Sequence, residues 1–230
     1  LGYGKVFDDL LRGQIDTVAE RIERDIKKGR RRLQHLKVRT QWLDNALEDT
    51  FAKHRDPIID LYEATFRGAF RNVGPVVKAE RPDAVRGGIY AGKAANRLEQ
   101  ILCTATKRQV LRGLSEIPSD ASTEEVLAAA CDAFDARHIS RVKTIAKTES
   151  MGAANAGAYA AYSLGNVSLL EWAATKDGRG RSHHAEAHGQ IRAVGTPFEV
   201  GKSRLLYPHD PDGDVAETVC CRCGVVPSDE

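Results

Sequence analysis

The side chains best suited to chemistry lie near the C-terminus. The segment 183–188 holds three histidines, and further along comes the run Cys220-Cys221-Arg222-Cys223. Imidazole and thiolate are the ligand types that Zn²⁺ prefers in closed tetrahedral sites. Histidines one helical turn apart share a face of a helix, and alternate cysteines share a face of a strand. The candidate ligands of a zinc ion are therefore His184, His188, Cys221 and Cys223.

The same segment allows other interpretations. His184 with Cys221 would be a general base and nucleophile, as in thiol hydrolases. Asp177, His184 and Glu186 would be acid and base partners for phosphodiester cleavage, the reaction of a metal-dependent nuclease. A solvated surface run of histidines is a further interpretation. The residues thus leave open a structural metal site, a hydrolytic centre or a plain polar surface.

A second chemical feature is a basic segment, 27–39, that contains no acidic residue. On a helix its side chains would project around much of the circumference, so DNA or another partner with distributed negative charge could lie along it. Acids on either side, such as Glu23 and Asp44, also fit the solvated face of a long helix. The candidate DNA-binding residues are Lys27, Lys28, Arg30, Arg31, Arg32, Lys37 and Arg39.

Helical periodicity dominates the first half of the chain. Apolar residues recur in helical steps from Phe7 to Phe51, which predicts one long helix over residues 6–51, with Gly29 as a place where it could kink. Asp56-Pro57 is expected to end this helix, because the residue before proline is pushed away from helical angles. Further helices are predicted over residues 57–73 and 89–114.

The second half has a different character. Ser122 and Glu125 have the spacing of a capping box, which predicts a helix beginning beside them. The run 151–161 is rich in alanine and glycine, so a neighbouring element could approach it closely. Residues 167–172 resemble a strand, and the turn formers after residue 176 favour short strands and loops. We therefore predict an α+β protein, with a helical arm over residues 1–117 and a small α+β domain over residues 118–230.

The overall composition excludes several classes of protein. No apolar stretch is long enough to cross a membrane, which requires about 18 residues. The formal net charge of +2 is too small to mark the whole chain as a nucleic-acid binder, so any such surface must be local. Five cysteines, an odd number, of which three are crowded at 220, 221 and 223, do not suit a secreted disulfide scaffold and favour a reducing compartment. The absence of an initiator methionine suggests a piece of a longer chain.

An ordered series of short motifs begins after residue 140. It comprises segments 144–149 and 154–157, Glu171-Trp172, Asp177-Gly178-Arg179-Gly180-Arg181, His184, Gly189-Gln190, Pro197-Phe198, Gly201, segment 207–211 and Cys221-Arg222-Cys223. In order and spacing, this series resembles the C-terminal domain of the phage Mu F-like minor head proteins, over residues from about 120 to 226.

The resemblance implies a shared site that acts as a conformational lock or a metal staple. The residues that match the family pattern are Asp177, Arg179, His184, Cys221 and Cys223. Two positions depart from it: His188 stands where an acid or another residue is more usual, and Cys220 stands where a polar residue is usual. A His184–His188 ligand pair would therefore be peculiar to this chain.

The resemblance also implies a function. Proteins of this kind are structural rather than catalytic, take part in head morphogenesis, and lie inside or at the neck of the phage head. The expected partners are the portal protein, other head proteins and packaged DNA, in an oligomeric assembly formed in the host cytoplasm. A metal-dependent, nuclease-like hydrolase built on the Asp, His and Cys cluster is the alternative, and a plain DNA-binding protein is a third hypothesis.

Overall fold

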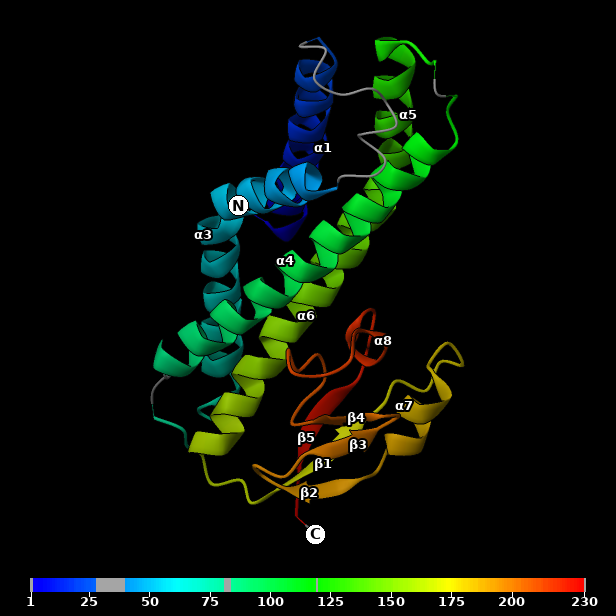
Figure 1. Cartoon of the computed structure of the whole chain (residues 1–230). Helices are drawn as coiled ribbons and strands as arrows, with labels where there is room; N and C mark the ends of the chain where they lie inside the picture. The colour runs from blue at the N-terminus through cyan, green and yellow to red at the C-terminus, as the bar shows by residue number, and fades with distance from the viewer. Residues whose placement is uncertain (1, 28–39, 81–83, 119, 230) are drawn as a thin grey trace. The chain divides into compact units, whose positions relative to one another are not determined.

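The computed structural model of the chain describes residues 2–27, 40–80, 84–118 and 120–229 and has the predicted α+β class (Figure 1). Long helices come first, and short strands and helices follow. The long helices are α1 (Tyr3–Lys27), α3 (Gln41–Val73), α4 (Ala84–Ser115), α5 (Thr123–Asp135) and α6 (His138–Leu164). The remaining elements are β1 (Leu169–Ala173), α7 (Ser182–Ala187), β2 (Ile191–Ala193), β3 (Phe198–Val200), β4 (Ser203–Leu205), α8 (Val215–Thr218) and β5 (Gly224–Ser228).

Two predictions about the first helices are wrong. Thr40 is not helical and α3 begins at Gln41, so no continuous helix runs over residues 6–51. Pro57 does not end a helix but lies inside α3. An internal proline removes a backbone hydrogen bond and costs about 3 kcal/mol. The helix persists because its apolar side chains are buried on both sides of the proline, with Phe51 and Ile58 fully buried.

Contacts within the chain define two compact units. The first comprises Leu1–Ile58 and Ala95–Lys143, and the second comprises Ile59–Ala94 and Thr144–Glu230. The division of the chain into a helical domain and a Mu F-like domain at residue 118 stays a prediction. None of the described helices combines the length and apolar character that crossing a bilayer requires.

The first unit has an apolar core contributed by α1, α3, α4 and α5. The predicted capping box is present at the start of α5: the Glu125 backbone N–H donates to Ser122 Oγ over 3.2 Å, and the Ser122 N–H donates to Glu125 Oε2 over 2.7 Å. The box satisfies backbone N–H groups at the start of α5, and one face of this helix joins the core. The buried residues of the core are Val18, Ile22, Trp42, Leu43, Leu47, Val110, Leu114, Val126 and Ala130.

In the second unit, the alanine- and glycine-rich part of α6 packs tightly against α3. A Cβ added at Gly157 would lie 2.2 Å from the carbonyl oxygen of Phe66, far inside van der Waals contact. The predicted close approach at residues 151–161 is therefore confirmed, with a helix as the neighbour. Glycine at this position lets the two backbones touch.

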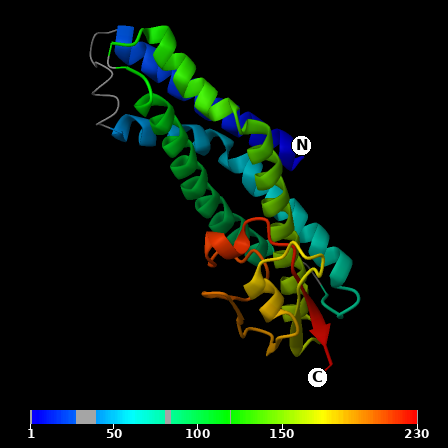
Figure 2. The same cartoon turned by 90° about the vertical axis from the view of Figure 1, so that its right-hand side faces the viewer.

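The strands form one antiparallel sheet and one hairpin. The sheet has the order β2-β1-β5, and β3 pairs with β4. The strand predicted at residues 167–172 appears as β1, which buries Leu170 and Trp172 on one face. Trp172 packs against Phe198 of β3 with ring centroids 5.4 Å apart. Both views place α7 and α8 next to the strands (Figures 1 and 2).

Candidate metal centre

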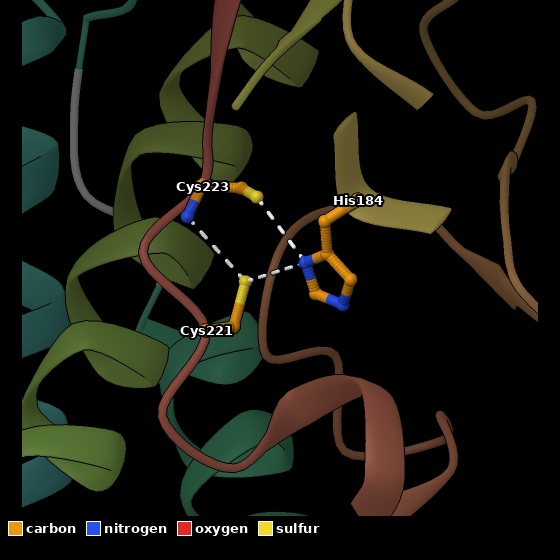
Figure 3. A group of neighbouring side chains, drawn as sticks. All are labelled: His184, Cys221 and Cys223. Atoms are coloured by element: carbon orange, nitrogen blue, oxygen red, sulfur yellow. Dashed lines mark hydrogen bonds between the residues drawn. The ribbon is translucent and has the colours of Figure 1, made fainter. Parts of the chain in front are cut away.

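Three of the predicted zinc ligands converge on one point of the second unit (Figure 3). His184 Nδ1 lies 3.3 Å from Cys223 Sγ and 3.5 Å from Cys221 Sγ. The potential ligand atoms of all three residues lie within 4.8 Å of one another. Each residue is at most 5% exposed, so the group is closed off from bulk solvent on most sides.

Separate elements bring these side chains together. His184 lies on α7, Cys221 follows α8, and Cys223 directly precedes β5. Between the last two elements the chain bends sharply at Cys220, which has a φ of 57° and whose N–H donates to Thr148 Oγ1. Pairing of β5 with β1 then fixes the position of Cys223, because Gly224 is opposite Ala173.

The spacing of the three atoms suits tetrahedral zinc. With Zn–S bonds of about 2.3 Å and Zn–N bonds of about 2.0–2.1 Å, a tetrahedron has N···S edges of about 3.6 Å. The two observed distances from Nδ1 to the sulfurs, 3.3 and 3.5 Å, are close to that value. The residues present therefore fit a zinc ion that is held by two sulfurs and one nitrogen.

Electrostatic effects within the cluster favour the thiolate form of one cysteine, Cys223. The neighbouring Cys221 thiol and then the His184 imidazole lower the pKa of Cys223, against the opposing effect of burial. In turn, Cys223 raises the pKa of Cys221 and of His184. The Cys223 backbone N–H points at Cys221 Sγ over 3.4 Å, a contact that stabilises negative charge on sulfur. These shifts favour a thiolate on Cys223 and a neutral thiol on Cys221, so a metal ion held by both sulfurs would have to displace the proton of Cys221.

Sequence reasoning missed Glu217, which orients the histidine. With the proton of His184 on Nε2, that N–H donates to Glu217 Oε2 over 3.0 Å and leaves the Nδ1 lone pair facing the sulfurs. Glu217 is 6% exposed, and its Oε2 also lies 3.2 Å from Nε2 of His183. Metal-binding histidines commonly donate their second N–H to a carboxylate in this way. No spacing rule links residues 184 and 217, so the sequence carried no signal for this contact.

The glycine at position 201 leaves room for that carboxylate. A Cβ at Gly201 would lie 2.6 Å from Glu217 Oε1, and the residue has a φ of 60°. Both the close approach and the left-handed backbone favour glycine. Gly201 belongs to the motif series found in the sequence, and its contact with Glu217 gives a physical reason for its place there.

Asp177 and Arg179 of the family pattern lie next to the cluster. Asp177 accepts hydrogen bonds from both terminal nitrogens of Arg222, one of them over 2.7 Å, and from Arg179 Nη2 over 2.9 Å. Arg222, followed by Arg179, holds the pKa of Asp177 well below its usual range. Because Arg222 stands between Cys221 and Cys223, this pair ties the loop before α7 to the cysteine run, as a conformational lock would.

The remaining predicted site residues lie elsewhere or outside the described residues. The α7 helix ends at Ala187, and His188 Nδ1 accepts a hydrogen bond from the Ala174 N–H over 3.3 Å, so His188 does not join the group. Glu186 is exposed. Of the basic segment, residues 28–39 and the side chain of Lys27 are outside the described part, and the DNA-binding assignment there stays a prediction.

Beside the cluster is a cavity of about 210 Å³, lined in part by His184, Cys221 and Cys223. Because these residues supply three ligand atoms, a zinc ion held by them would take its fourth ligand from another source. Structural zinc sites are usually closed by four protein ligands, whereas catalytic sites keep one position open.

A family model described as "Phage Mu protein F like protein" matches residues 76–226, a range that contains the whole cluster. Comparison with curated proteins and with solved structures gives no match.

Proposed function

This chain belongs to the phage Mu F-like family, which indicates a role in phage head morphogenesis, and on that premise we propose that it is a structural component of the head that associates with the portal and contacts packaged DNA. The proposal places the protein in the virion, in the head interior or neck, as part of an oligomeric assembly that forms in the host cytoplasm.

One observation supports a structural role above all. The candidate centre connects the loop at Asp177, α7, α8 and the start of β5, and its ligand atoms are buried. The strands of this region are only three to five residues long, too short to build a large core of their own. A metal cross-link supplies stability where short elements cannot. We propose that Zn²⁺ is bound by His184, Cys221 and Cys223, where it supplies a fixed cross-link.

Metal analysis tests the zinc proposal. The full chain, purified without chelator, is expected to contain one zinc ion per chain, and the double variant C221S/C223S is expected to contain none. Cys131 is a half-buried cysteine outside the cluster, so C131S is the matched control and should retain the metal. Full-length protein that is folded and free of metal after growth with zinc would contradict the proposal.

Co-purification tests the assignment to the head. The protein is expected to fractionate with portal and proheads and to bind DNA with an affinity that falls as salt rises. Replacing Arg30, Arg31 and Arg32 by glutamine should weaken DNA binding and reduce its salt dependence. A soluble protein absent from purified particles would contradict the proposed function.

The set of three protein ligands supports one alternative, a metal-dependent hydrolase of the nuclease type, because catalytic zinc sites use three protein ligands and a water. Such a water would be activated by zinc, as in hydrolytic zinc sites. Incubation of the purified protein with DNA and RNA, with and without chelator, separates the two functions. The structural proposal expects binding without cleavage, whereas chelator-sensitive cleavage that is lost in C221S/C223S would establish the hydrolase.

A further inference from the structure

The cavity beside the candidate metal centre has a strongly one-sided lining. Three arginines, Arg179, Arg181 and Arg222, line it together with the cluster, and no acidic residue is among its described lining residues. This is a different set of basic residues from the segment 27–39. It lies in the second unit, in the part of the chain that the family model covers.

The nearby acid only partly balances these charges. Arg179 and Arg222 both contact the single carboxylate of Asp177. Arg181 donates from Nη2 to the carbonyl oxygen of Val219, a neutral partner, and forms no ion pair among the described residues. Three guanidinium groups, the Asp177 carboxylate and the Glu217 carboxylate 3.0 Å from His184 leave an excess of one positive charge. A zinc ion with two thiolate ligands is neutral, so a metal in the cluster would not cancel that excess.

We propose that this cavity binds a phosphate oxyanion, which the backbone of packaged DNA supplies in the particle. Guanidinium groups bind phosphate through planar, bidentate hydrogen bonds, and partial burial strengthens these hydrogen bonds. A volume of about 210 Å³ accommodates a phosphate group. The site itself needs neither the metal nor the basic segment, although DNA as the source of phosphate rests on the proposed function.

Arg181 is the residue that tests the site, because it forms no ion pair with an acid in the described part of the chain. We would compare the full chain with R181Q, with R181K, and with the control R204Q, which removes the same charge from an exposed position of β4 outside the cavity. Binding of inorganic phosphate is measured by calorimetry. Binding of a short DNA duplex is measured by fluorescence anisotropy over a range of salt concentrations.

The proposal expects R181Q to weaken phosphate binding about tenfold, the usual effect of losing one charge-assisted hydrogen bond. It also expects R181Q to weaken DNA binding and to lower the salt slope by about one. R181K should lose less than R181Q, and R204Q should bind phosphate as the unchanged protein does. Thermal melting of each variant shows whether loss of the Val219 contact has unfolded the region. If R181Q melts early, R179Q is used instead, because the Arg179 side chain is 80% exposed and its loss disturbs packing least.

Two results would overturn the proposal. Equal phosphate affinity in R181Q and R204Q would show that the cavity is not an anion site. Phosphate binding that falls in R181Q while DNA binding stays unchanged would remove DNA as the source and leave free phosphate as the ligand. Portal co-purification of the unchanged protein is measured separately, so failure of this site and failure of the proposed function are distinguishable.

Discussion

Replacing Glu217 tests whether the candidate centre is organised for metal. Glu217 Oε2 lies 3.0 Å from His184 Nε2, and the carboxylate is 6% exposed. Glu217→Gln keeps the shape of the side chain but removes its charge, and Glu217→Ala removes the hydrogen bond as well. In both variants we expect zinc to bind more weakly, because the imidazole is less basic and, in the alanine variant, is free to rotate.

The magnitude follows from the kind of contact that is lost. Loss of a carboxylate that orients a metal-binding histidine costs about 10- to 100-fold in metal affinity, or about 1.4–2.7 kcal/mol. Glutamine can still accept from Nε2, so Glu217→Gln should be near the lower value. Glu217→Ala also leaves an empty space beside Gly201 and should be near the upper one.

The assay is competition for zinc against a chelator of known affinity, together with the absorption spectrum of the cobalt-substituted protein. Glu199→Gln, an exposed acid on β3, is the matched control and should leave zinc affinity unchanged. If both Glu217 variants bound zinc as tightly as the control, while only the melting temperature of the metal-free protein fell, the carboxylate would have a packing role and the reasoning would be refuted.

The other expected effects concern packing, acid and thiol chemistry. Gly157→Ala should destabilise the protein by about 1–3 kcal/mol in urea unfolding, because the new methyl group meets a backbone carbonyl. Gly92→Ala, on a helix with nothing within 4 Å, should instead be neutral or stabilise by up to about 1 kcal/mol. Because the folded-state pKa of Asp177 is below its unfolded value of about 4, its ion pairs stabilise the fold above that pH and lose this effect on acidification. Asp177→Asn should therefore show a flatter dependence of melting temperature on pH below about 5. With a thiol reagent at pH 8, the exposed Cys220 should react quickly, whereas Cys103, whose pKa burial raises to about 12, should react only on unfolding.

Much of the helical architecture was predictable because it depends on local patterns. The capping box joins Ser122 to Glu125, three residues away, and the local run of small residues around Gly157 signalled a close approach, although the sequence did not identify Phe66 as its partner. Pro57 shows the limit of such reasoning. Its local preference is to end a helix, but burial of the apolar face of α3 on either side outweighs that preference. The energy that keeps the helix intact comes from contacts with other elements, which local patterns do not report.

The residue types that form the candidate centre were also predictable, but the exact set of residues was not. Histidine and cysteine are recognisable as possible metal ligands from residue type alone, and the sequence predicts His184, Cys221 and Cys223 as ligands. Periodicity alone added His188, because it assumed a helix that in fact ends one residue earlier. The spacing that looked like one helical turn is not helical at its last position.

The amino-acid sequence was therefore sufficient for the α+β class, the family and the identities of three candidate ligands, since each depends on residue type and order along the chain. The distances between His184 and the two sulfurs, the carboxylate of Glu217 behind the imidazole and the arginine-lined cavity depend on how α7, α8 and β5 pack in space. Contacts between residues far apart in the chain have no fixed spacing, so folding alone brings these groups together.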